Sequence, residues 1–220
     1  MLFRSLAREI LEKRTLSIEA ADFVGRNLAK AKLALGDALL AIFGQYDWSC
    51  LEREKRLKRL EPAETPPSWQ RIREHHSSGV AFKLHPNRVS KPVDLFSEEH
   101  REISELASEL WLWVESRRLK RHFTSVHDYV FHSEAKCPQV APGRNFLLNL
   151  KTFGLGSVFD PITWRYPRER LFNALPLLLW NGELSFHPEF RRHLQRQLQT
   201  DASDWTGLVS AYKEVWPGNG

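Results

Sequence analysis

Apolar residues recur at every third or fourth position along most of this chain, which is the spacing that gathers side chains on one face of an α-helix. The longest run predicts a helix from Ile18 to Phe43. Ser17 is positioned to cap its start and Gly44 to end it. Its apolar stripe indicates packing along a partner helix and comprises Ala21, Val24, Leu28, Ala31, Leu35, Ala38 and Ile42.

The same spacing predicts a series of further helices. Ser49 and Ser97 occupy N-cap positions, and Pro167 and Pro188 stand where helices begin. The predicted helices cover residues 2–11, 50–60, 98–122, 144–153, 167–180, 188–198 and 205–216.

Proline and glycine interrupt the helical pattern in two places. Five prolines lie between residues 61 and 92, so we expect an irregular connection over 61–96 with only a short helix, at 68–76. A second irregular stretch is expected over 131–143. No segment alternates apolar and polar residues for long, and residues 79–84 are the sole strand candidate.

These elements predict an all-α protein, an irregular array of about seven to nine helices with long loops. We expect residues 1–220 to form a single helical domain, with the connection at 61–96 inside it. The chain opens within an amphipathic pattern that has no capping residue before it. Two interpretations follow: the chain is the C-terminal part of a longer protein, or its first helix frays at a true N-terminus.

Composition narrows the class of protein without naming a function. The 32 basic residues exceed the 27 acidic ones too little to indicate nucleic-acid binding, so we expect such binding to be at most weak. Two cysteines in 220 residues suggest a reducing compartment. The longest apolar runs are far shorter than the roughly 20 residues that span a bilayer. We therefore expect a cytoplasmic protein that does not enter a membrane.

Asp37 is the most unusual residue of the long helix, because its helical neighbours Leu33, Ala34, Leu40 and Ala41 are all apolar. A carboxylate on such a face has to be paired or protonated. Arg53 is the first candidate partner, since the turn at 44–48 would fold the short basic helix back against the long one. A structural ion pair and a substrate contact are both open at this point.

Two other patterns are too incomplete for the chemistry that they resemble. One is an even spacing of five residues, which fits no familiar zinc site, so no metal is expected; it comprises His122, His127, His132 and Cys137. The other is the segment 154–160, which has a Gly-Ser pair but only one following carboxylate, Asp160. Two-metal nucleotidyl transfer needs two nearby carboxylates. No catalytic residue is therefore assigned.

An arginine followed five residues later by a histidine occurs twice, at Arg71 and His76 and at Arg117 and His122. This spacing resembles the catalytic pair of the HEPN ribonucleases, in which the histidine acts as an acid or base near a scissile phosphate. The motif is short, and chance matches are expected in a chain with nine histidines. An HEPN-type ribonuclease is kept as an alternative function.

The stretch Ala29-Lys-Ala-Lys-Leu-Ala-Leu-Gly-Asp-Ala-Leu-Leu-Ala-Ile-Phe-Gly-Gln-Tyr46, followed by Ser49 and Arg53, resembles a helical region of bacterial nucleotidyltransferase-like proteins. That region lies downstream of the catalytic domain and has a Lys-rich Leu-Gly-x-x-Leu-Leu helix, a Gly-x-Tyr turn and an arginine. The resemblance covers about 25 residues.

The resemblance implies a helical accessory or substrate-side domain, without a complete catalytic site in this chain. Lys30, Asp37, Tyr46 and Arg53 would then belong to the wall that faces a nucleotide or a small-molecule acceptor. No cofactor is expected in the chain itself, and Mg²⁺ and a nucleotide would come only with an upstream catalytic domain. The second alternative is a helical protein-interaction module with no catalytic role.

Overall fold

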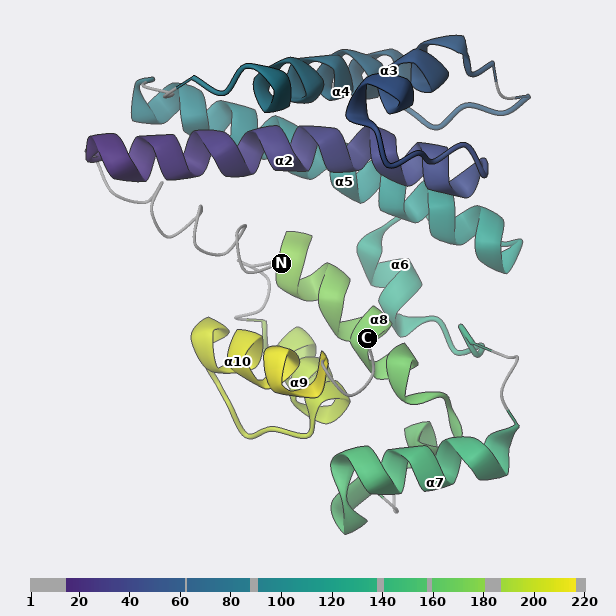
Figure 1. Ribbon diagram of the computed structural model, residues 1–220. Coiled ribbons are helices and arrows are strands. Elements are labelled where there is room, and N and C mark those ends of the chain that lie inside the picture. Colours follow the sequence, from purple (N-terminus) through teal and green to yellow (C-terminus); the bar gives the residue numbers. More distant parts are fainter. Residues whose placement is uncertain are drawn as a thin grey trace. The chain divides into compact units, whose positions relative to one another are not determined.

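The computed structural model describes residues 15–61, 63–87, 91–137, 141–157, 160–180 and 187–216 (Figure 1). The helix predicted at 2–11 lies outside these residues. The described part contains nine α-helices, two short 3-10 helices and no strand, which confirms the all-α prediction. None of the described helices has the length and apolar character needed to cross a membrane.

The chain divides into two compact units, residues 1–118 and 119–220, where the sequence predicts a single domain. The spacing of apolar residues shows which face of a helix is buried but not which helix covers it. The first contains α2 (Ile18–Ile42), α3 (Cys50–Arg59), α4 (Trp69–Leu84) and α5 (Val93–Leu119), the last of which ends at the boundary.

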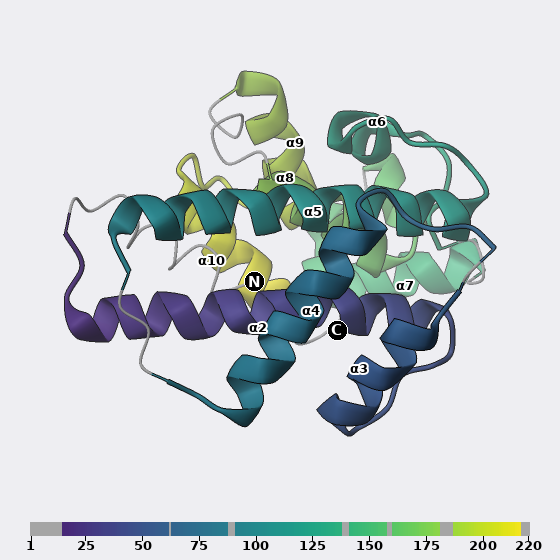
Figure 2. The same cartoon turned by 90° about the horizontal axis from the view of Figure 1, so that it is seen from above.

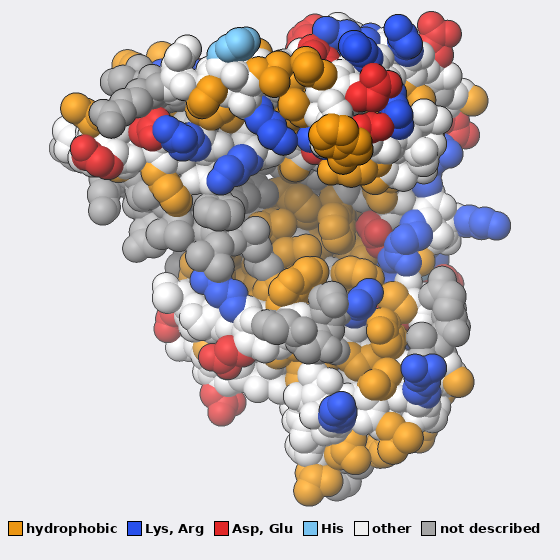
Figure 3. Space-filling model, viewed as in Figure 1, with side chains coloured by type: hydrophobic (Ala, Val, Ile, Leu, Met, Phe, Trp, Pro, Cys, Tyr) orange, Lys and Arg blue, Asp and Glu red, His pale blue; other side chains and the backbone are white. Residues whose placement is uncertain are grey.

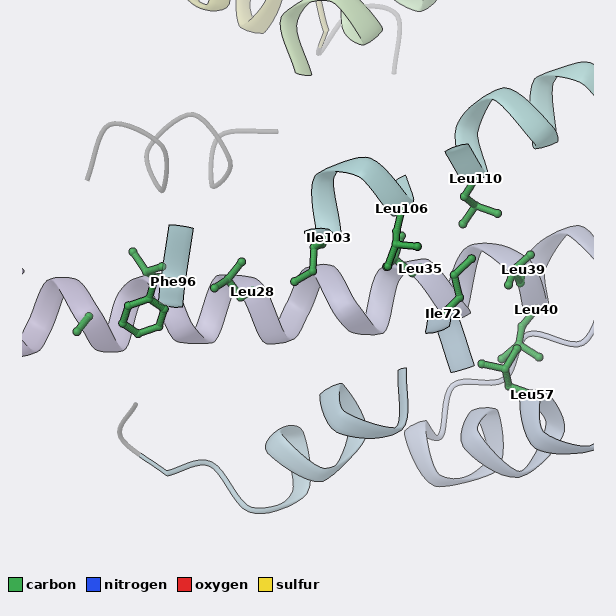
Figure 4. Packing of buried hydrophobic residues seen from close by; sticks show 12 residues of the cluster. Leu28, Leu35, Leu39, Leu40, Leu57, Ile72, Phe96, Ile103, Leu106 and Leu110 are labelled. Atoms are coloured by element: carbon green, nitrogen blue, oxygen red, sulfur yellow. The ribbon is translucent and has the colours of Figure 1, made fainter. Parts of the chain in front are cut away.

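The core of the first unit forms where α2 and α5 lie side by side (Figures 1 and 2). Phe96, Ile103 and Leu106 of α5 point toward α2, and Ile72 of α4 and Leu57 of α3 extend the same cluster (Figure 4). All five side chains are almost entirely buried. Burial of this apolar surface is the main force that holds the four helices together.

Helix α4 crosses α2 at very short range (Figure 2). A Cβ atom on Gly36 of α2 would lie 2.4 Å from Cδ2 of His76, and one on Gly79 of α4 would lie 3.0 Å from the carbonyl oxygen of Ala29. The two glycines therefore let the helices approach where any side chain would collide.

The short helix predicted at 68–76 is confirmed from Trp69 and continues to Leu84 as α4, so the irregular connection predicted over 61–96 is wrong only for residues 77–84 and 93–96, which are helical. The strand candidate at 79–84 is the end of α4. The buried face of α4 has helical spacing, at Ile72, His76, Gly79 and Val80. A histidine and a glycine occupy two of these four positions, so the sequence shows no continuous apolar stripe there. The prolines lie outside α4, before and after it.

Helix α5 begins at Val93, four residues before the predicted cap at Ser97. The carbonyl oxygen of Pro92 accepts the first hydrogen bond of the helix, from the N–H of Phe96 at 3.3 Å. The fully buried Phe96 ring fixes this early turn. At the other end the helix stops at Leu119, because Lys120 has a φ of 52°, so the predicted end at His122 is also wrong.

The second unit is arranged around α8 (Pro167–Trp180), which packs against four other helices. Those helices are α6 (Val126–Phe131), α7 (Pro142–Phe153), α9 (Pro188–Leu198) and α10 (Trp205–Val215). Two 3-10 helices, Leu155–Ser157 and Pro161–Trp164, lie between α7 and α8. The predicted helix starts at Pro167 and Pro188 are confirmed. The side chain of Asp204 caps α10 by accepting a hydrogen bond from the N–H of Gly207.

Candidate functional site

Asp37 and Arg53 form an ion pair between α2 and α3. The Nε atom of Arg53 lies 2.7 Å from the Oδ1 atom of Asp37, and the Arg53 residue is only 4% exposed. The Asp37 side chain is 23% exposed. The prediction that a basic group, with Arg53 the first candidate, lies within reach of Asp37 is confirmed.

Arg53 also holds the turn that precedes its own helix. Its Nη1 atom lies 2.9 Å from the carbonyl oxygen of Asp47, 3.1 Å from that of Trp48 and 3.3 Å from the hydroxyl oxygen of Tyr46. The guanidinium carbon lies 5.1 Å from the centre of the Tyr46 ring. One guanidinium thus ties α2, the turn and α3 together, through its ion pair with Asp37 and its hydrogen bonds to neutral oxygens of the turn.

His76 of α4 completes this polar cluster. Its Nε2 atom lies 3.2 Å from the same Oδ1 atom of Asp37 that contacts Arg53, and its ring is fully buried against Gly36. The Nδ1 atom is buried with no hydrogen-bond partner among the described residues. We define Gly36, Asp37, Tyr46, Arg53 and His76 as the α2–α4 polar cluster.

Of the four residues predicted to bind substrate, the structure brings Asp37, Tyr46 and Arg53 together but not Lys30. Lys30 is exposed and lies seven residues before Asp37 in the same helix, about 10 Å away along the axis. Lys32, also on α2, forms an ion pair with Glu99 of α5. Asp37 and Arg53 neutralise each other, which is the arrangement of a structural ion pair.

The two arginine–histidine patterns take part in other contacts. Arg71 donates to Glu102 at 2.8 Å from the surface of α4, whereas the fully buried His76 faces α2. Arg117 pairs with Glu64 and its guanidinium lies 5.0 Å from the centre of the Trp113 ring. Because the ring of His76 has no contact with solvent, the first of the two pairs does not present a histidine to a substrate.

A buried polar cluster in the second unit was missed in the sequence. Arg170 is completely buried in the first turn of α8, and its Nε atom donates to Oδ1 of Asn149 at 3.0 Å. The Nδ2 atom of Asn149 donates in turn to the carbonyl oxygens of Asn145, Thr163 and Arg165. The spacing of Asn145 and Asn149 on one face of α7 could have revealed this cluster, since two asparagines four residues apart mark a polar stripe.

Charges elsewhere in the molecule form local pairs. Asp160 accepts from Nη2 of Arg196 at 2.6 Å and from the N–H of Ile162 at 3.0 Å. Partial burial opposes ionisation of Asp160, but these hydrogen bonds outweigh it and lower its pKa. Basic and acidic side chains lie interspersed on the face seen in Figure 3.

Within the part of the chain that the structure describes, no three histidine, cysteine, aspartate or glutamate side chains come close enough to hold a metal ion. His132 instead lies 3.3 Å from Glu134, and the ring of His127 packs 4.6 Å from that of Phe131.

Comparison with protein-family models, with curated proteins and with solved structures finds no match for this chain.

Proposed function

We propose that this chain is the helical accessory, substrate-side part of a nucleotidyltransferase-like protein of the cytoplasm, and that the chemistry takes place outside it. One observation carries the proposal. Gly36, Asp37, Tyr46 and Arg53 belong to the segment that resembles such proteins, and all four lie in the α2–α4 polar cluster. Residues that carry the resemblance therefore contact one another within the α2–α4 polar cluster.

Within this proposal the four residues of the predicted wall have different tasks. Asp37 and Arg53 neutralise each other and hold α3 against α2, so they position the wall rather than touch a ligand. Tyr46 is 54% exposed and Lys30 is exposed. These two side chains are the ones that reach an acceptor molecule. Mg²⁺ and a nucleotide belong to the catalytic part of the protein.

A helical protein-interaction module is the second candidate, because large apolar side chains are exposed around the turn between α2 and α3. Trp48 is 88% exposed and Leu51 is 48% exposed. Trp is enriched at the centres of protein interfaces, where it contributes a large share of the binding energy. In this case a partner protein would cover the turn, and no nucleotide would be involved.

The experiment compares the recombinant chain with native material. Antibodies against the recombinant chain would isolate the native protein from its source cells, and both samples would be incubated with Mg²⁺ and nucleoside triphosphates labelled at the α-phosphate. We expect transfer of the label to an acceptor by the native material and none by the recombinant chain.

Two outcomes would overturn the proposal. Transfer by the recombinant chain alone would make it an enzyme in its own right. Native material that contains the chain but neither binds nor transfers nucleotide would favour the interaction module. In the native material, Tyr46→Ala and Lys30→Ala should weaken acceptor use, whereas Lys58→Ala, a change of an exposed lysine on α3, should not.

A further inference from the structure

A pocket of about 700 Å³ opens in the second unit, where the ends of α7, α9 and α10 meet the start of α8. Every residue that lines it belongs to this one unit. Pockets that bind small organic molecules have volumes of roughly 300–1,000 Å³. The size of the pocket is therefore suited to a metabolite rather than to a single ion.

The rim of the pocket carries positive charge from two helices. Lys151, in the last turn of α7, and Arg168, in the first turn of α8, both line the pocket, and both residues are exposed. Helix α8 begins at Pro167, another lining residue. The N-terminal end of a helix carries a partial positive charge, so α8 adds to the potential of the two side chains.

A third cation lies behind the pocket wall. The guanidinium carbon of Arg170 lies 4.5 Å from the centre of the Phe153 ring, and Phe153 lines the pocket. Nη1 of Arg170 donates to the carbonyl oxygen of Arg196 at 3.0 Å, two residues before the lining residue Leu198. Its Nη2 atom is buried with no hydrogen-bond partner among the described residues.

The charge of Arg170 persists at neutral pH. Burial lowers the pKa of its guanidinium to about 10, and the negative charge of Asp160 opposes this effect. A group with this pKa is still protonated at pH 7. Because a buried charge is screened less by solvent than a surface charge, Arg170 contributes to the potential inside the pocket.

The remaining polar groups of the pocket indicate a ligand that has hydroxyl groups in addition to an anionic group. Thr152, Gln199 and Thr200 supply hydroxyl and amide groups, and Glu214 adds a single carboxylate to the lining. A carboxylate accepts hydrogen bonds from hydroxyl groups but repels a polyanion. Apolar side chains complete the walls, so a carbon skeleton can lie against them.

We propose that this pocket binds a small organic phosphate that carries hydroxyl groups, such as a sugar phosphate or a nucleoside monophosphate. The phosphate lies toward Lys151, Arg168 and the start of α8, and a hydroxyl group of the ligand donates to Glu214. A phosphate monoester has close to two negative charges and three acceptor oxygens, which matches several converging donors. The proposal rests on the pocket alone and does not depend on the proposed function.

The test is a titration of the full recombinant chain by calorimetry, with backbone amide shifts followed by NMR. The probes are ribose 5-phosphate, adenosine 5′-monophosphate, ribose and inorganic phosphate. We expect at least one of the two organic phosphates to bind with a Kd below about 1 mM, and more tightly than ribose or inorganic phosphate. The amides of Thr152, Arg168 and Thr200 should shift. The organic phosphate that binds more tightly then shows whether a ribose or an adenosine fits the walls of the pocket better.

Variants with matched controls locate the site. Lys151→Gln and Arg168→Gln should each weaken binding by about tenfold or more, and Lys151→Arg and Arg168→Lys should restore most of it. Arg144→Gln on α7 and Arg192→Gln on α9 change exposed arginines outside the pocket and should have little effect. Glu214→Gln should improve the binding of inorganic phosphate relative to the organic phosphates.

The proposal is overturned if neither organic phosphate binds at about 10 mM, or if the control variants lose as much affinity as the pocket variants. The same holds if inorganic phosphate binds as tightly as both organic phosphates, since the site would then select an anion only. A melting temperature measured for every variant confirms that it is folded. None of these outcomes bears on nucleotidyl transfer by the native protein, so the two proposals can fail separately.

Discussion

The Nε atom of Arg53 lies 2.7 Å from the Oδ1 atom of Asp37, and this contact joins two helices whose facing surfaces are otherwise largely apolar. The pairing follows from the sequence, because an acid among apolar helical neighbours needs a partner. The same oxygen also contacts Nε2 of His76 at 3.2 Å. One carboxylate therefore links α2 to both α3 and α4.

Replacing Asp37 with alanine should destabilise the protein by about 3 kcal/mol, because the buried guanidinium of Arg53 loses its counter-charge. Urea unfolding at pH 7 measures this loss. The double variant Asp37→Leu with Arg53→Met should recover much of it, although the hydrogen bonds of Arg53 to the turn are then lost.

The control for this prediction is Glu52→Ala. Glu52 pairs with Arg56 within α3, and both side chains are more than a third exposed, so its loss should cost about half a kcal/mol. An unchanged melting temperature for Asp37→Ala would contradict the buried pair and favour a carboxylate that faces solvent or substrate.

Replacing Gly36 with alanine should destabilise the protein by about 1–3 kcal/mol through overpacking. The new Cβ atom would lie 2.4 Å from Cδ2 of His76, and the ring is held in place by Asp37. In a His76→Ala background the collision is gone, and the same change should be neutral or slightly stabilising because alanine favours a helix. A double-mutant cycle by urea unfolding measures this coupling.

Gly143 provides the matched control for this cycle. It also lies in a helix, α7, but a Cβ atom there would meet nothing within 4 Å. Gly143→Ala should therefore leave stability unchanged or raise it. Equal destabilisation at both glycines would show that backbone conformation, rather than contact with His76, sets the cost at Gly36.

Sequence reasoning located the elements best where burial and apolar character coincide. Stripes of apolar residues with clear ends mark the helices in question. The features predicted correctly there are the helix cap at Ser17, the Asp37–Arg53 pair and the helix starts at Pro167 and Pro188. Helix α4 was predicted only as far as residue 76, because two of its four buried residues are His76 and Gly79. His76 and Gly79 suit the buried face of α4 because they contact α2, and a contact between two helices cannot be read from the sequence.

The polar interior of the second unit was beyond prediction for a related reason. Arg170 and Lys136 are completely buried, whereas arginine and lysine are almost always exposed. Lys136 donates to Oδ1 of Asn173, and its Nζ atom lies 4.4 Å from the centre of the Tyr129 ring. Asn173 and Tyr129 are 37 and seven residues away from Lys136 in the sequence. Only the fold therefore shows that the charge of this buried lysine is satisfied.

Replacing Arg170 with methionine should destabilise the second unit by about 3 kcal/mol. The variant keeps the apolar stem but leaves Oδ1 of Asn149 and the carbonyl oxygen of Arg196 buried without their donor. Hydrogen exchange should show the loss of protection in α7 and α9. Arg192→Met, at an exposed position of α9, should stay within about half a kcal/mol of the parent. If the two variants were equally stable, the buried network would contribute nothing measurable.

Stability should fall between pH 7 and pH 5 because of His193. The imidazole packs 4.6 Å from the Phe131 ring, and its Nε2 atom lies 3.2 Å from Nε2 of Gln197. Burial lowers its pKa from 6.5 to about 4, and the charges of Lys136, Arg196 and His127 act in the same direction. Between these two values the unfolded chain binds a proton that the folded chain does not, so unfolding becomes easier as the pH falls.

The contribution of this one proton should be about 2 kcal/mol between pH 7 and pH 5. The lowered pKa of Asp160 acts only near and below pH 4, where its stabilising charge is lost, so it does not interfere. His193→Gln keeps a hydrogen-bond acceptor for Gln197 and has no titrating group. Urea unfolding at the two pH values should therefore show a smaller loss for this variant than for the parent chain. His122→Gln, at an exposed histidine, should leave the pH dependence unchanged. Identical losses for His193→Gln and the parent chain would mean that the imidazole of His193 is as readily protonated in the folded protein as in the unfolded one.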